Sequence, residues 1–205
     1  MALKNTYNAT VGVIGTGNFG TALANLLAHK CKRVLLYARN EQKATQLIET
    51  RKNGSHQIAD NVEIITDISL LAEKCNVIFP IVPSINFREM MKKLSPYLKP
   101  YHVLIHGTKG FDFNEINNKN NALKESKNQI FTMSEVIRQE SSVVRIGCIA
   151  GPNLSKEIAL KMPAASVIAS DFDEVIHLGQ KYLKSDRFLV FGSNDLMSTE
   201  LCGIL

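Results

Sequence analysis

Three glycines near the start of the chain have a spacing that can hold a diphosphate. Gly15, Gly17 and Gly20 stand in the order G-x-G-x-x-G, directly after the apolar run 11–14 and directly before the helix-like segment 21–28. In that context the first glycine permits a tight strand-to-helix turn, the second lets a pyrophosphate approach the backbone, and the third lets the helix pack on the strand. The free N–H groups and the positive end of the helix dipole would face the two phosphates. The pattern predicts a dinucleotide site, and an ordinary strand-to-helix turn is the alternative.

A basic residue follows the second predicted strand. Segment 33–38 is nearly all apolar, as expected of a strand that is buried on both faces, and Arg39 comes next. Dinucleotide folds usually place an acid there, which binds the adenosine ribose. A guanidinium attracts a 2′-phosphate instead, so Arg39 favours NADP, or the use of both NAD and NADP. A solvated arginine at a strand end is the alternative.

A lysine in a short glycine-flanked turn is the candidate catalytic residue. Lys109 lies between Gly107 and Gly110, after the predicted strand 102–106. A ketone that accepts a hydride develops negative charge on its oxygen, and a fixed cation nearby lowers the barrier. Lys109 could stabilise that charge or hold a substrate phosphate, and a solvated lysine is the alternative.

Alternating strands and helices must position these residues. Strands are predicted at 11–14, 33–38, 63–66, 76–82, 102–106, 144–150, 164–170 and 187–191. Helices are predicted at 21–28, 41–52, from Asp67, at 85–94, from Asn153 or Ser155, at 173–183 and at 195–205. This order predicts a Rossmann-like doubly wound α/β fold, with a mostly parallel sheet and helices on both faces. Pro83 and Lys109 then lie with the glycine turn at the carboxyl edge of the sheet, where such folds bind ligands.

Three local features complete this interpretation. Asn53-Gly54 is a common C-terminal stop and is expected to end the helix 41–52. Pro80 conflicts with a central strand, so we expect it at a position where no N–H is needed. The Asn- and Lys-rich segment 114–128 has little periodicity and is expected to be a polar surface loop or a frayed helix.

Composition restricts the class of protein. The chain has 205 residues, 45% hydrophobic and 21% charged, which fits one substantial soluble α/β domain. No apolar run could span a bilayer, and the polar N-terminus lacks a signal-peptide core, so we expect a cytoplasmic protein. Four cysteines without a C-x-x-C pair and five histidines without ligand spacing indicate reduced thiols and no metal. The net charge of +5 suits anionic small molecules, whereas scattered lysines give no nucleic-acid signal.

Several motifs occur in the order and spacing of one enzyme family. They are the segments 11–24, 82–84, 108–110, 151–157, 163–165, 188–191 and 200–203. Over essentially its whole length the chain resembles NAD(P)-dependent glycerol-3-phosphate dehydrogenase of the bacterial type. The resemblance implies that a nicotinamide cofactor reduces dihydroxyacetone phosphate to glycerol 3-phosphate, which feeds phospholipid synthesis.

The resemblance assigns roles to individual positions. With the glycine turn, it implies cofactor contacts for Gly15, Thr16, Gly17, Asn18, Phe19, Gly20, Arg39, Pro83, Lys109 and Ser155. It implies substrate contacts for Lys109, Gly151 and Asn153, of which Lys109 is also the implied active-site lysine. Asn153 stands where the family more often has Ser or Thr, although an amide can also donate a hydrogen bond.

The family pattern continues beyond the residues at hand. In that family, Glu-x-x-Gly-x-x is followed by Lys-Asn, whose lysine is the general acid/base. A helical domain that closes over the substrate comes after it. We therefore expect a dinucleotide-binding domain at 1–192 and the start of a helical substrate domain at 193–205. We expect cofactor binding to exceed turnover, and a homodimer at full length. An apolar docking surface is expected around Leu196, Leu201, Ile204 and Leu205.

Two other classes of function stay open. One is a related two-domain dehydrogenase, such as a ketopantoate reductase or a 6-phosphogluconate dehydrogenase, against which the Gly-Pro-x-x-x-x-Glu segment at 151–157 argues. The other is a non-catalytic module that senses or sequesters a dinucleotide. Cofactor binding without turnover would favour the module only if the gene ends after Leu205.

Overall fold

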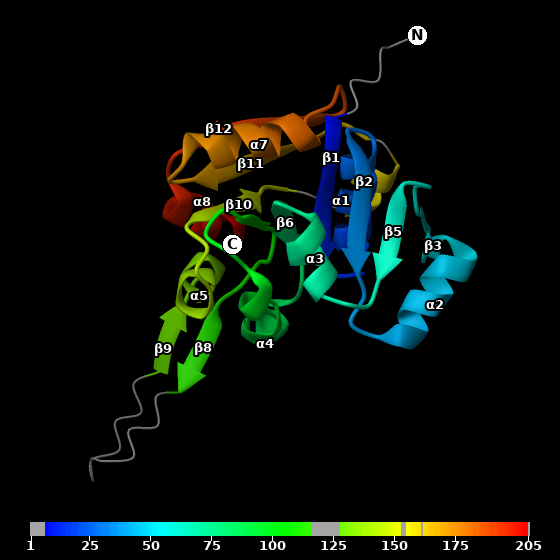
Figure 1. Cartoon of the computed structure of the whole chain (residues 1–205). Coiled ribbons are helices and arrows are strands. Elements are labelled where there is room, and N and C mark those ends of the chain that lie inside the picture. The colour runs from blue at the N-terminus through cyan, green and yellow to red at the C-terminus, as the bar shows by residue number, and fades with distance from the viewer. Residues whose placement is uncertain (1–6, 116–127, 153–154, 161, 205) are drawn as a thin grey trace.

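An eight-stranded sheet forms the centre of the molecule. The computed structural model describes residues 7–115, 128–152, 155–160 and 162–204. The order across the sheet is β12-β11-β10-β7-β6-β1-β2-β5 (Figure 1). Its strands are β1 (Tyr7–Ile14), β2 (Cys31–Tyr37), β5 (Val62–Ile65), β6 (Val77–Pro80), β7 (Val103–His106), β10 (Arg145–Ala150), β11 (Ala164–Ser170) and β12 (Phe188–Ser193).

Most of the sheet is parallel. Strands β10, β7, β6, β1, β2 and β5 pair in parallel, β11 is antiparallel to β10, and β12 is parallel to β11. The predicted Rossmann-like, mostly parallel α/β fold is confirmed. The carboxyl ends of the parallel strands therefore meet at one edge, which is the edge where the glycine turn begins.

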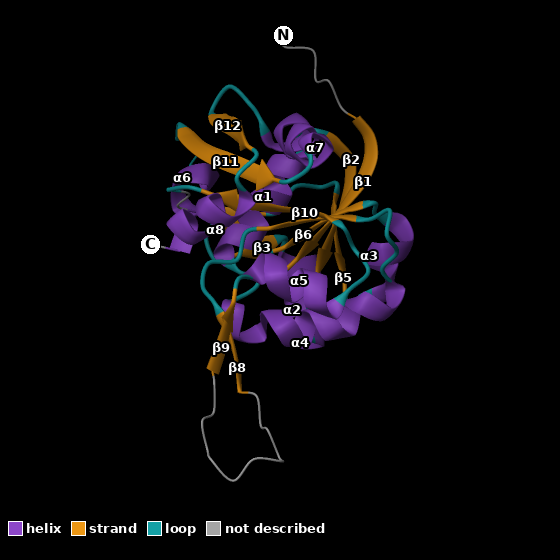
Figure 2. Cartoon of the chain, turned by 90° about the vertical axis from the view of Figure 1, so that its left-hand side faces the viewer, coloured by secondary structure: helices purple, strands orange, loops and turns teal. Residues whose placement is uncertain are grey.

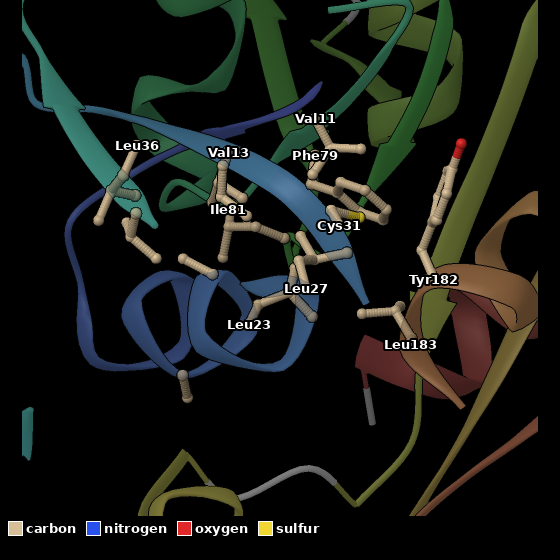
Figure 3. Close-up of a cluster of buried hydrophobic side chains, with 14 of the residues drawn as sticks. Val11, Val13, Leu23, Leu27, Cys31, Leu36, Phe79, Ile81, Tyr182 and Leu183 are labelled. Atoms are coloured by element: carbon tan, nitrogen blue, oxygen red, sulfur yellow. The ribbon is translucent and has the colours of Figure 1, made fainter. Parts of the chain in front are cut away.

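Helices cover both faces of the sheet. They are α1 (Asn18–Ala28), α2 (Glu41–Thr50), α3 (Ser69–Lys74), η1 (Ser84–Asn86), α4 (Phe87–Leu94), η2 (Ser95–Tyr97), α5 (Met133–Glu140), α6 (Ser155–Ala159), α7 (Asp173–Leu183) and α8 (Leu196–Ile204). Helices α1 and α7 supply apolar side chains to one core cluster, and α3, α4 and α5 supply them to a second. Figure 3 shows Leu23 and Leu27 of α1 lying against Val13 of β1 and Ile81, which directly follows β6. Each such buried side chain stabilises the fold by about 1.5–3 kcal/mol.

The end of α2 differs from the prediction. The helix ends at Thr50, and Arg51 follows in the left-handed conformation with a φ of 51°. The guanidinium of Arg51 donates to the carbonyl oxygens of Ala59 and Val62, which holds this residue in place. The next residues form a small hairpin of β3 (Lys52–Asn53) and β4 (His56–Gln57), so Asn53-Gly54 is the turn of a hairpin and not the stop of the helix.

Pro80 is tolerated because it is the last residue of β6. The register between β6 and β7 runs only from Val77↔Val103 to Ile78↔Leu104. Beyond it, Pro80 contributes its carbonyl oxygen, which accepts a hydrogen bond of 3.1 Å from the N–H of Gly107.

A second hairpin projects from the body of the molecule (Figure 2). It consists of β8 (Asp112–Glu115) and β9 (Asn128–Phe131), so the ends of the predicted polar loop 114–128 are strands, while 116–127 lie outside the described residues. Helix α5, which follows it, has no counterpart in the predicted elements. The base of the hairpin is held by Arg88, whose Nε donates to Asp112 Oδ2 at 2.8 Å and whose Nη1 pairs with Glu140 on α5. Sequence periodicity does not reveal this long-range anchor.

Candidate dinucleotide site

The three glycines of the first turn have three different environments. Gly15 has a φ of +122°, and a Cβ there would lie 2.1 Å from the carbonyl oxygen of Ile81. A Cβ on Gly20 would lie 2.1 Å from the carbonyl oxygen of Gly15. Gly17, the N-cap of α1, faces open space, with nothing within 4 Å of an added Cβ. The turn is therefore closed on its inner side and leaves its backbone open to a ligand, as the G-x-G-x-x-G spacing predicts.

A buried amide supports this turn from outside the motif. The Asn53 side chain, which is 6% exposed, donates from Nδ2 to the carbonyl oxygen of Thr16 and to Oγ1 of Thr21, both at 2.8 Å. The β3–β4 hairpin thus fixes both the loop and the first turn of α1. Sequence reasoning missed this role, because the local signal of Asn53-Gly54 is that of a turn.

A cavity of about 310 Å³ opens beside the turn. It is lined by Gly15, Thr16 and Gly17, by Arg39 after β2, and by Pro83 after β6, so these five predicted site residues lie together. Apolar side chains, among them Ile68 and Met90, complete its wall. The glycine cradle and this lining fit a dinucleotide, with the phosphates at the N-terminus of α1 and a base on the apolar wall.

Two charged residues of α4 also line this cavity. Glu89 and Lys93 pair at 2.7 Å, one helical turn apart. The hydrogen bond and the charge of Lys93, together with the charge of Arg39, hold the pKa of the Glu89 carboxyl below its usual value. Sequence reasoning missed both residues, although their spacing of four on a helix after a central strand was visible.

The other residues at the start of α1 lie close to the end of β7. Asn18 is exposed, and the ring of Phe19 lies against Gly107, where an added Cβ would be 3.1 Å from its Cε1 atom. Gly20 is buried between the turn and Ile81. Phe19 thereby joins the glycine turn to the loop that carries Lys109.

The loop after β7 is fastened to the loop after β6. Thr108 donates from Oγ1 to the carbonyl oxygen of Val82 at 2.7 Å. Gly110 has a φ of +121°, and a Cβ there would lie 2.6 Å from Oγ of Ser84. Lys109 between them is exposed and does not line the cavity. A fixed backbone therefore presents a free cation near the carboxyl edge, which is what charge stabilisation needs.

The predicted site residues Gly151, Asn153 and Ser155 belong to the segment between β10 and the start of α6. Gly151 follows β10, which lies beside β7 with Cys148 opposite His106, so Gly151 and Lys109 leave adjacent strands. Ser155 is the first residue of α6, which packs against α1. Neither Gly151 nor Ser155 lines the cavity, and Asn153 lies outside the described residues.

The expected docking surface is only partly present. Leu196 is buried against Cys148 and Ala169, because α8 packs on β10 and β11, so this part of the expectation is wrong. Leu201 is exposed and Ile204 is half-buried, while Leu205 lies outside the described residues.

The described ranges hold no cluster of three or more His, Cys, Asp or Glu side chains that could bind a metal ion. None of their helices is long and apolar enough to cross a bilayer.

Comparison with known proteins agrees with this geometry. Residues 10–176 match the family model described as NAD-dependent glycerol-3-phosphate dehydrogenase N-terminus. The glycerol-3-phosphate dehydrogenase [NAD(P)+] of Acinetobacter baylyi is 35% identical over 199 residues, covering 95% of this chain and 52% of the relative. That of Teredinibacter turnerae is 31% identical over 204 residues, covering 98% of this chain and 56% of the relative. A crystal structure of glycerol-3-phosphate dehydrogenase from Coxiella burnetii superposes with a TM-score of 0.81 at 25% identity, over 96% of this chain and 57% of that one.

The fold and the glycine turn define a Rossmann-like dinucleotide-binding domain. Within that class, the chain belongs to the family of NAD-dependent glycerol-3-phosphate dehydrogenases, to whose N-terminal part it corresponds. The chain spans about half the length of the curated relatives it matches.

Proposed function

We propose that this chain binds NAD or NADP at the carboxyl edge of its sheet and serves as the coenzyme-binding half of a glycerol-3-phosphate dehydrogenase. The observation that carries the proposal is the glycine turn, in which two glycines are sterically required and the third leaves the backbone open. The Arg39 guanidinium in the same cavity favours the 2′-phosphate of NADP.

The residues of this chain have separate roles in the proposed reaction. The backbone from Gly15 to Gly20, with Asn18 and Phe19, binds and orients the cofactor, which supplies the hydride when bound. Lys109 holds the substrate phosphate or stabilises the negative charge on the reacting oxygen of dihydroxyacetone phosphate. Gly151 and Asn153 are substrate contacts, and Ser155 is a cofactor contact. The described contacts support Lys109 most directly, because Thr108 and Gly110 fix the loop that carries it.

The proposal extends to the organisation of the protein. Residues 1–192 form the dinucleotide-binding domain, and 193–205 begin a helical substrate domain. The full-length protein acts on small molecules in the cytoplasm as a homodimer, without nucleic acid and without a bound metal. Its product, glycerol 3-phosphate, feeds phospholipid synthesis.

Two measurements test the proposed function. The chain contains no tryptophan whose quenching could report binding, so binding of NADH or NADPH is followed by the fluorescence of the reduced nicotinamide itself. Turnover is measured with dihydroxyacetone phosphate on the protein encoded by the complete reading frame. Lys109→Met is expected to lower kcat/KM roughly 100-fold or more, whereas Lys92→Met on α4 leaves it unchanged. Failure of this chain to bind either nucleotide would overturn the proposal.

A further inference from the structure

Glu89 and Lys93 line the same cavity as Arg39. Both side chains of the pair are more than half exposed, at 61% and 53%, although they meet at 2.7 Å. Such exposed pairs contribute little to stability, so either partner can turn to a ligand at small cost. The pair is therefore available for binding and is not a structural requirement of α4.

The charged side chains that line the cavity are not all of one sign. Arg39 and Lys93 are two cations, and Glu89 places one carboxylate with them. Arg39, which follows β2, and Glu89, on α4, come from different elements and interact electrostatically in the cavity that both of them line. Most dinucleotide folds place an acid after the second strand, whereas Glu89, the acid that lines this cavity, belongs to α4.

We propose that Glu89 is a specificity-determining residue, which opposes Arg39 and Lys93 and favours a dinucleotide with a free 2′-hydroxyl over one with a 2′-phosphate. A carboxylate accepts a hydrogen bond from a ribose hydroxyl and repels a phosphate, while the two cations attract the phosphate. The balance of one anion against two cations gives a site that takes both NAD and NADP. This inference rests on the proposed function, because it assumes that the cavity holds the adenosine end of the cofactor.

The test compares the affinities of the chain for NADPH and NADH at low salt, using wild type, Glu89→Gln and Lys93→Gln. Removing the carboxylate is expected to raise the affinity for NADPH roughly threefold to tenfold, and to leave that for NADH equal or lower. Removing the ammonium is expected to lower the affinity for NADPH more than that for NADH. Both effects should shrink as salt is added, because the groups are exposed.

A matched control is available on α3. Glu73 is also exposed and also pairs with a lysine, Lys74, at 2.6 Å, but it does not line the cavity. Glu73→Gln should leave both affinities as in wild type. Equal ratios of the two affinities in wild type and Glu89→Gln would overturn the role of Glu89 and leave the proposed function intact. A wild-type chain that binds neither nucleotide would overturn both.

Discussion

The Nε2 atom of His106 lies 3.3 Å from Oε1 of Glu200, and the two residues are only 1% and 4% exposed. Ser134 on α5 joins the pair, with its backbone N–H donating to the same Glu200 oxygen at 3.1 Å. This cluster connects the last residue of β7, a short distance before Lys109, to α8. It ties the loop that carries the candidate catalytic lysine to the helix at the end of the chain.

The cluster predicts a loss of stability in acid. Burial alone would raise the pKa of the Glu200 carboxyl, but the hydrogen bond and charge of His106 and the hydrogen bonds of Ser134 outweigh it and hold the pKa below its ordinary 4.5. A group with a lowered pKa stabilises the fold above its unfolded pKa and loses that contribution as the pH falls through the folded value. The free energy of unfolding should therefore decrease as the pH falls below 4.5.

Glu200→Gln tests this link. The variant should lose about 1–3 kcal/mol of unfolding free energy at neutral pH in urea titrations, and part of the acid dependence should disappear. Glu174→Gln is the control, because Glu174 pairs with Arg145 at 3.1 Å on the surface, and there the loss should stay below about 1 kcal/mol. An unchanged acid dependence in Glu200→Gln would show that the pair does not stabilise the fold.

The four cysteines should differ in reactivity. Burial raises the pKa of Cys31 to about 11 and the pKa values of Cys75 and Cys148 to about 12, whereas Cys202 on α8 is exposed. Because the thiolate is the reactive form, a disulfide reagent at neutral pH should modify Cys202 quickly in the native chain and the other three only after unfolding. Cys202→Ser should abolish the fast phase. Rapid modification of a second thiol would contradict the packing described for the core.

The sequence predicted the parts of the site that depend on local geometry. The G-x-G-x-x-G spacing identified the turn because two of its glycines are required by the turn itself: Gly15 has a φ of +122°, and a Cβ on Gly20 would meet the carbonyl oxygen of Gly15. Arg39 and Pro83 could be placed beside it because parallel strands end at one edge of the sheet.

The unpredicted parts depend on tertiary contacts. In the sequence Asn53 looks like a helix stop. In the structure the β3–β4 hairpin packs beside α1, and the Asn53 amide donates to the carbonyl oxygen of Thr16. In the sequence Glu89 looks like an ordinary surface carboxylate, and only the packing of α4 beside the cavity makes it a lining residue. His106 and Glu200 are far apart in the chain, and no spacing rule links them.

Arg39 is expected to determine the affinity of the site for a nucleotide that carries a 2′-phosphate. Arg39→Asp should lower the affinity for NADPH roughly tenfold or more and leave the affinity for NADH similar or higher, because a carboxylate repels the phosphate and accepts from a hydroxyl. Lys32→Asp, an equal change of charge near the start of β2, should alter neither. Equal NADPH affinity in wild type and Arg39→Asp would contradict the assignment of Arg39.

Asn53 should affect both stability and nucleotide binding. Asn53→Ala leaves the Thr16 carbonyl and the Thr21 hydroxyl without their donor, which should lower the unfolding free energy by about 1–3 kcal/mol and loosen the phosphate loop. Asn61 is the matched control, since its Nδ2 donates to the carbonyl oxygens of Ala28 and Cys31 at 2.9 and 3.1 Å, at the C-terminal end of α1 and the start of β2. Asn61→Ala should lose stability but keep the affinity for NADH. Equal losses of affinity in the two variants would show that Asn53 has no special role at the turn.

Substitutions at two glycines of the turn should have different effects, one on the stability of the fold and the other on nucleotide binding. Gly20→Ala places a Cβ 2.1 Å from a carbonyl oxygen, and either the helix or the turn must move, at a cost of about 3 kcal/mol or more. Gly17→Ala meets no atom within 4 Å, so the fold should persist while the methyl group occupies the space into which a pyrophosphate comes. Gly54→Ala, at a φ of +57° in open space, measures what backbone strain alone costs and should lower stability by about 1 kcal/mol. Thermal unfolding and NADH binding distinguish the three variants, and a Gly17→Ala chain that binds NADH as tightly as wild type would place the diphosphate elsewhere.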